Sequence, residues 1–288
     1  MIRDFIASWP LFAPTYLTGW LLAILLPLLG VYVVARNQIF MGAAIAQAST
    51  LGIALSMIAA SCLSAFHIHA LENSATVGAV VFAGAASLAM SLSYGRRESH
   101  EAVAAWIFLV SASLSVLVVA HSPHGLDEIQ RLASSSLIGA TRGDVFLYAL
   151  LTLLTAGFFF RHHRTLTLLA LDPDMAASVG HAPRRWFPAM AIILGLVIGF
   201  SIRSAGLLYT FGCLVLPALI AKNLVRTIRP LYFVSPLLGL ATSVAGFILA
   251  HRLDLPPAQN TIALQAILLG LCWGGRRLRP FWPASVSP

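Results

Sequence analysis

Apolar runs long enough to cross a lipid bilayer recur along the whole 288-residue chain. A transmembrane helix needs about 20 consecutive, mostly apolar residues. The runs that approach this length are 16–35, 40–66, 75–94, 102–120, 144–160, 187–202, 205–221, 231–250 and 261–274. The short runs 187–202 and 205–221 are expected to form a hairpin or a partly re-entrant pair that turns at SIRSAG (201–206). The sequence therefore predicts an all-α polytopic membrane protein with eight or nine transmembrane helices.

Charged residues are too scarce to cover a soluble protein of this size. Hydrophobic residues make up 59% of the chain and charged residues only 10%, and the mean hydropathy is +0.87. The basic residues behind the net charge of +8 lie in short clusters at the ends of apolar runs, not in a patch interleaved with aromatic side chains. This arrangement excludes nucleic acid as the expected partner. We expect a single transmembrane domain over residues 1–288, surrounded by lipid.

The basic residues are divided unequally between alternate connections, thirteen on one side and five on the other. The larger set is Arg36, Arg96, Arg97, Arg161, Arg164, Arg184, Arg185, Lys222, Arg226, Arg229, Arg276, Arg277 and Arg279, and the smaller set is Arg3, Arg131, Arg142, Arg203 and Arg252. Cytoplasmic loops carry the excess of Lys and Arg. This asymmetry predicts that the N-terminus lies outside and the C-terminus inside.

A short polar segment, LALDPDMAASVGHAPRRW (169–186), interrupts the apolar runs. Asp172 is a good helix N-cap, Pro173 suits the first helical position and Asp174 favours the positive end of a helix. Gly180 can end the helix in a left-handed conformation. A helix of roughly two turns over 172–180 is too short to be stable alone in water. It either docks against another surface or merely joins two spans as a solvated turn.

The sequence lacks the motifs of a membrane enzyme. Lys222 is the only lysine and does not lie in a phosphate-binding loop, HEAVA at 100–104 lacks the second histidine of a zinc protease motif, and no G-x-S-x-G is present. Every Asp, Glu and His falls in a connection or at the end of an apolar run, whereas ion-driven carriers usually keep such a group within the membrane. If the protein moves a solute uphill, we expect a partner to supply the energy.

Five segments in order along nearly the whole chain resemble sequence blocks of one known family. They are VYVVARNQIFMGAAIAQASTLGIAL (31–55), LIGATRGDVFLYALL (137–151), ALDPDMAASVG (170–180), IRSAGLLYTFGCLVLPALIAKNL (202–224) and LDLPPAQNTIAL (253–264). The third is close to D-P-E-x-A-x-x-x-G. Together they are similar to the permease subunits of ABC transporters for zinc, manganese and iron, which are multi-pass proteins of the bacterial plasma (inner) membrane.

The resemblance implies a role for the short polar helix. Its residues Asp172, Pro173, Asp174, Ala177 and Gly180 would form the coupling helix, which inserts in a groove of a cytoplasmic ABC ATPase. The expected transporter contains two copies of the permease and an ATPase dimer, and a periplasmic or extracellular solute-binding protein delivers the cargo. ATP and Mg would bind to the ATPase partner, and no cofactor is expected in this chain.

The chain departs from the family at the position of its metal ligands. The family's early helix usually reads G-D-x-L-x-H-A, in which Asp and His lie four apart on one helical face. Here GAAIAQA places Ala43 and Gln47 at those positions, and neither is a strong ligand for zinc. We therefore predict no tight metal site within the membrane. The cargo path would instead use neutral groups: Gln47, Thr50 on the same face, and Gln265 near the C-terminus. The two glutamine amides either contact the cargo or form hydrogen bonds between helices.

Histidines in the expected outer loops offer a second candidate metal site. His67 and His69 lie in one loop, and His121 and His124 in another. They either form a vestibule that captures metal or are exposed polar residues.

Two alternatives to a metal permease remain open. One is a permease of the same family adapted to a non-metal solute. The other is a stand-alone secondary carrier of the drug/metabolite type, although such carriers usually show two repeated halves and no capped cytoplasmic helix.

Overall fold

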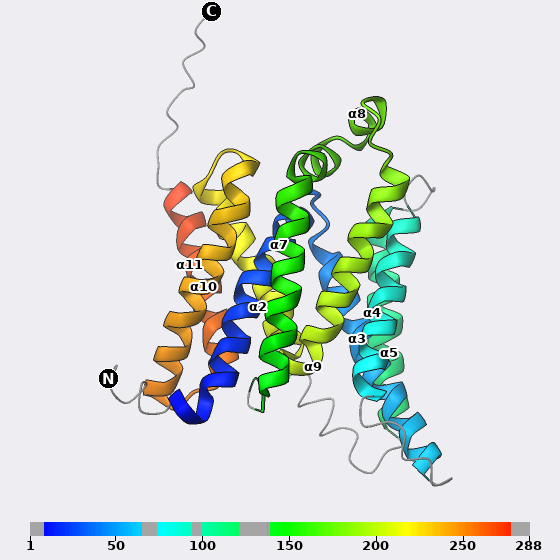
Figure 1. Ribbon diagram of the computed structural model, residues 1–288, viewed down its shortest axis with the longest axis vertical. Helices are drawn as coiled ribbons and strands as arrows, with labels where there is room; N and C mark the ends of the chain where they lie inside the picture. Colours follow the sequence, from blue (N-terminus) through cyan, green and yellow to red (C-terminus); the bar gives the residue numbers. More distant parts are fainter. Residues whose placement is uncertain (1–8, 65–73, 94–98, 121–136, 138, 278–288) are drawn as a thin grey trace, which may run out of the picture.

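Every regular element is helical in the part of the chain that the computed structural model describes, residues 9–64, 74–93, 99–120, 137 and 139–277. The helices are α2 (Trp9–Ala35), α3 (Ile39–Ser64), α4 (Ser74–Leu92), α5 (His100–Val119), α7 (Arg142–Leu171), α8 (Pro173–Ser178), α9 (Pro183–Leu224), α10 (Ile228–Leu253) and α11 (Pro257–Arg277). All of them except α8 and α11 are long and apolar enough to cross a membrane, which gives seven candidate spans. The long helices form one bundle, and α8 lies beyond one end of it, here called the α8 end (Figure 1). The prediction of an all-α polytopic membrane protein is confirmed.

α9 is a hairpin that turns at Gly206. This residue has φ +76°, a conformation that glycine adopts without strain. Before the turn, the Phe187 ring lies against Arg36, just beyond the last residue of α2. After it, the Tyr209 hydroxyl donates a 2.9 Å hydrogen bond to the carbonyl oxygen of Gly19, near the other end of α2. The first half of α9 therefore runs away from the α8 end and the second half returns (Figure 1), as the hairpin prediction for 187–202 and 205–221 required.

The returning half of α9 packs directly on the backbone of α2. A Cβ atom at Gly30 would overlap the carbonyl oxygen of Leu214, so only glycine fits there without displacement. Farther along, Ala221 packs with Val31 and Leu231 in a buried cluster at the α8 end. Hydrocarbon provides no hydrophobic force between helices, so close contact between small residues is what holds them together.

Small residues also join α4 to the first half of α9. Ala83 and Ser87 are fully buried, and the Ser87 hydroxyl donates a 2.5 Å hydrogen bond to the carbonyl oxygen of Ala191. A Cβ atom at Gly195 would lie 2.7 Å from the Cα atom of Gly84. The small-residue run AGAAS (83–87) therefore packs two helices closely.

α7 extends beyond the span predicted from the sequence. The apolar run 144–160 ends at the basic cluster RHHR (161–164), which favours a stop at the membrane surface. In the structure the helix has a non-helical residue, His162, and then continues to Leu171. The part beyond the break crosses the α8 end of the bundle and leads into α8 (Figure 1).

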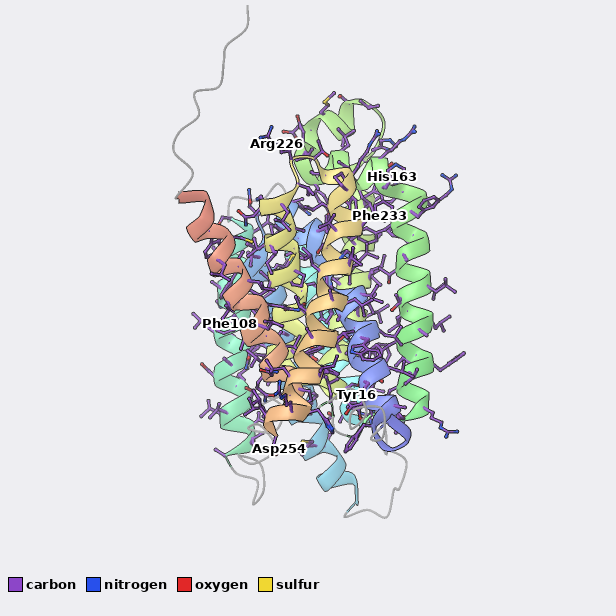
Figure 2. The ribbon with its side chains drawn as sticks, turned by 90° about the vertical axis from the view of Figure 1, so that its left-hand side faces the viewer. Tyr16, Phe108, His163, Arg226, Phe233 and Asp254 are labelled. Carbon is purple, nitrogen blue, oxygen red and sulfur yellow. The ribbon has the colours of Figure 1, made fainter. Side chains whose placement is uncertain are left out.

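The basic residues separate between the two ends of the bundle as the sequence predicts. Arg226 and Asp254 mark the opposite ends in Figure 2. In the described part of the chain, the basic residues toward the α8 end include Arg36, Arg161, Arg164, Arg184, Arg185, Lys222, Arg226 and Arg229. Those toward the other end are Arg142, Arg203 and Arg252. Which end faces the cytoplasm stays a prediction.

The contact between Gly30 and Leu214 makes a stability prediction. Gly30→Ala should lower the free energy of unfolding by about 1–3 kcal/mol, because the added methyl group overpacks a backbone contact. Thermal unfolding of the purified protein in detergent measures the change. Gly157→Ala is the matched control, since no atom beyond the adjoining backbone of its own helix lies within 4 Å of the added Cβ atom. Equal stability of the two variants would contradict the proposed packing.

Candidate coupling helix and substrate path

α8 is capped at both ends by residues identified in the sequence. The Asp172 carboxylate accepts a 2.9 Å hydrogen bond from the backbone N–H of Met175, and Pro173 occupies the first turn. Gly180 has φ +91°. Its N–H donates to the carbonyl oxygen of Ala177, and the N–H of the following residue, His181, donates to that of Ala176. This pair of bonds is the Schellman motif, so the predicted capped helix is confirmed as a local structure.

One face of α8 is docked on the bundle. Ala176 is fully buried and packs with Leu169 at the end of α7 and Phe187 at the start of α9. Beside this contact, Met175 in α8 and Val179 at its C-cap are apolar but exposed, 55% and 61%. Leu171, the last residue of α7, is also exposed, at 63%. α8 is therefore anchored on the bundle through Ala176 and leaves apolar side chains exposed beside that contact.

The docking site of α8 is connected to the turn between α2 and α3. The Arg36 guanidinium carbon lies 3.9 Å from the centroid of the Phe187 ring, a cation–π contact. Arg36 also donates a 3.0 Å hydrogen bond to the hydroxyl of Tyr32, one turn earlier in α2. Phe187 therefore contacts α8 through Ala176 and the α2–α3 turn through Arg36. Sequence reasoning missed this connection, because the residues lie far apart in the chain.

The neutral residues of the predicted substrate path occupy one face of α3. Ala43 and Gln47 are partly buried, and Thr50 is 9% exposed. The Thr50 hydroxyl donates a 2.7 Å hydrogen bond to the carbonyl oxygen of Gln47. This bond uses the hydroxyl proton within the helix, which leaves the Gln47 amide as the main polar donor of the face.

Gln265 lies elsewhere in the bundle. Its side chain is fully buried, and its Nε2 atom donates to Thr242 of α10 over 2.9 Å and approaches the sulfur of Cys213 of α9 at 3.9 Å. α3, which carries Gln47, packs instead against α4, α5 and α9. The structure therefore does not bring the two amides together, and Gln265 is part of a contact between helices.

The candidate outer histidines His67, His69, His121 and His124 lie outside the described residues. In the described part, no group of three or more His, Cys, Asp or Glu side chains could hold a metal ion. That Ala43 and Gln47 stand at the positions of the family's metal ligands stays a prediction.

The chain is similar along almost its whole length to known membrane transport proteins. A sequence model described as "ABC 3 transport family" matches residues 8–273. A "probable metal transport system membrane protein" of Chlamydia muridarum is 22% identical over 286 residues, or 97% of this chain and 94% of that protein. The "manganese import system permease protein ScaB" of Streptococcus gordonii is 21% identical over 256 residues, or 88% and 86%. The solved structure "PsaBC from Streptococcus pneumoniae in complex with Fab" has the same fold, with a TM-score of 0.77, 18% identity and 95% of each chain covered.

The face of α3 generates a prediction about metal binding. Ala43→Asp combined with Gln47→His should create a site that retains zinc through gel filtration, since a carboxylate and an imidazole four residues apart can reach one ion. Bound zinc is measured per mole of purified protein. Ala43→Asn with Gln47→Asn adds side chains without strong ligands and should retain none. Stoichiometric transition metal between the helices of the unaltered protein would contradict the prediction that the native path lacks a tight site.

Proposed function

The chain belongs to the ABC 3 transport family, and from this premise we propose that it is the membrane-spanning subunit of an ATP-driven importer for a divalent transition metal ion or its complex. Zinc, manganese and iron are the candidate cargoes. The protein would reside in a bacterial plasma membrane and hydrolyse no ATP itself. The observation that carries the proposal is α8, a capped helix that is docked on the bundle through Ala176 and exposes the apolar side chains of Met175 and Val179.

The exposed face of α8 is the proposed contact with the ATPase. Met175 and Val179, together with Leu171 at the end of α7, would enter an apolar groove of that partner, while Ala176 keeps the helix on the bundle. Burying apolar side chains gains free energy without directional bonds, so the contact tolerates rocking. Movement of α8 reaches the α2–α3 turn through Phe187 and Arg36. ATP and Mg act in the partner.

The proposed assembly contains two copies of this chain. An ATPase dimer with two-fold symmetry offers two equivalent grooves, and each groove requires its own α8. A solute-binding protein outside the membrane would supply the cargo and most of the selectivity. This division of roles between the two proteins is consistent with α3, where Ala43 and Gln47 provide neutral rather than charged groups. Weak contacts suit a transport path, because a cargo held too firmly cannot leave.

The proposed topology has nine crossings, with α9 counted twice and α11 included. α2 begins at the end opposite α8, and α11 ends near the α8 end (Figure 1). The excess of basic residues at the α8 end supports a cytoplasmic location for that end. The N-terminus would then lie outside and the C-terminus inside.

The alternative of a secondary carrier is disfavoured by family membership and by α8, for which a stand-alone carrier has no use. A family member adapted to a non-metal solute remains the second candidate, and Ala43 and Gln47 are the observation that favours it.

The role of α8 predicts a loss of coupling without a loss of membrane insertion. Asp174→Lys places a cation at the positive end of the helix, and Gly180→Val places a branched side chain at φ +91°. Uptake by the complete transporter should fall at least about tenfold in each variant, equivalent to ~1.4 kcal/mol of coupling free energy. Uptake and cargo-stimulated ATP hydrolysis are measured together in vesicles.

The matched control is Asp254→Lys, which makes the same charge change at an exposed residue at the end of the bundle opposite α8 (Figure 2). It should transport normally. Normal uptake and normal stimulated hydrolysis in both α8 variants would refute the coupling role.

The topology is tested with a reporter that is active only in the cytoplasm. Fused after Pro288, it should be active, because the thirteen-to-five asymmetry of basic residues favours a cytoplasmic C-terminus. Fused before Met1, it should be silent. Activity at the N-terminus with silence at the C-terminus would reverse the orientation.

A further inference from the structure

A basic hollow lies at the α8 end, between the break in α7 and the start of α9. Its volume is about 560 Å³, within the ~300–1,000 Å³ range of small-molecule sites. The side chains that line it include Arg161, Arg164, His162, His163, His181 and Trp186, and none of the described lining residues is acidic. Two permanent cations and three imidazoles therefore surround a space large enough for an anionic group.

The hollow opens at the depth expected for lipid headgroups. Phe146, Leu153 and Phe160 form an exposed apolar face of α7, and they are 73%, 71% and 78% exposed. The face becomes cationic at Arg161, directly after Phe160. The helix begins at Arg142, and at 1.5 Å per residue Arg161 lies about 29 Å farther along. This length matches the ~30 Å thickness of the hydrocarbon core, so the two arginines mark its two surfaces.

Aromatic rings form one side of the hollow. The His162 ring lies 5.0 Å from the Trp186 ring and 5.1 Å from the Phe158 ring, between centroids. Tryptophan is enriched at the boundary between headgroups and acyl chains. Figure 2 shows His163 at the α8 end of α7, on the outer side of the bundle. The hollow is therefore reached from the membrane side of the molecule.

We propose that this hollow binds the phosphate-bearing headgroup of an anionic phospholipid, with the acyl chains along the exposed face of α7. Arginine guanidinium groups bind phosphate oxygens through two parallel hydrogen bonds, and basic pockets on the cytoplasmic side of helix bundles suit anionic lipid headgroups. Free phosphate offers the same oxygens, but it would leave the apolar face of Phe146, Leu153 and Phe160 unused. The bound lipid joins α7 to the start of α9, the two segments on which α8 is docked.

The test is native mass spectrometry of the purified full-length chain in detergent, titrated with phosphatidylglycerol. One such lipid per chain should be retained in preference to phosphatidylcholine. Arg161→Gln with Arg164→Gln should weaken retention about 30-fold, because each basic residue near an anionic headgroup contributes about 1 kcal/mol and 1.4 kcal/mol is a factor of ten. Arg161→Lys with Arg164→Lys should keep most of the binding, which separates lost charge from lost folding.

The matched control is Arg184→Gln with Arg185→Gln, which removes the same charge from exposed residues of the same end that do not line the hollow. This variant should bind the lipid as the unaltered protein does, and millimolar inorganic phosphate should not displace the lipid. Equal weakening in the two glutamine variants, equal retention of phosphatidylcholine, or displacement by inorganic phosphate would each overturn the proposal.

Discussion

Hydrocarbon offers no hydrogen-bond partner to a peptide group, so each segment inside a bilayer must satisfy its own backbone. This constraint accounts for the helical form of every regular element in the described part of the chain. It also bears on the hairpin of α9, whose turn at Gly206 is buried. Just before the turn, the Tyr148 hydroxyl donates a 2.8 Å hydrogen bond to the carbonyl oxygen of Phe200. A side chain therefore serves a backbone carbonyl close to the break.

Close packing of small residues joins these helices into one bundle. Gly30 admits the backbone of α9 at Leu214, and Gly195 admits the backbone of α4 at Gly84. Both halves of the α9 hairpin are thus held by neighbours that come from earlier parts of the chain. α9 in turn contributes Phe187, which holds Ala176 of α8. The position of the proposed coupling helix depends on these contacts in the membrane.

The sequence was sufficient for features that depend on local chemistry. Apolar length identifies the spans, Asp172 and Gly180 identify the ends of α8, and SIRSAG identifies the turn of α9. Features that depend on contacts between residues far apart in the chain could not be predicted from the sequence. The basic cluster at 161–164 favours a helix end, yet α7 continues because Leu166 and Leu169 beyond the break are buried. Nothing in one sequence predicts that Arg36 lies over Phe187 or that Gln265 bonds to Thr242.

The contact of Arg36 with Phe187 has a thermodynamic consequence for a transporter built on this chain. Arg36 directly precedes α3, the helix that carries Ala43 and Gln47, and Phe187 holds α8. Coupling between two binding sites is reciprocal: the free energy that one ligand transmits to the other site is returned in full. An ATPase that alters the cargo path through this contact is itself bound more or less tightly when cargo is present, by the same factor. In the proposed transporter the affinity for cargo and the affinity for the ATPase would therefore be linked, and a mutation at the contact would change both.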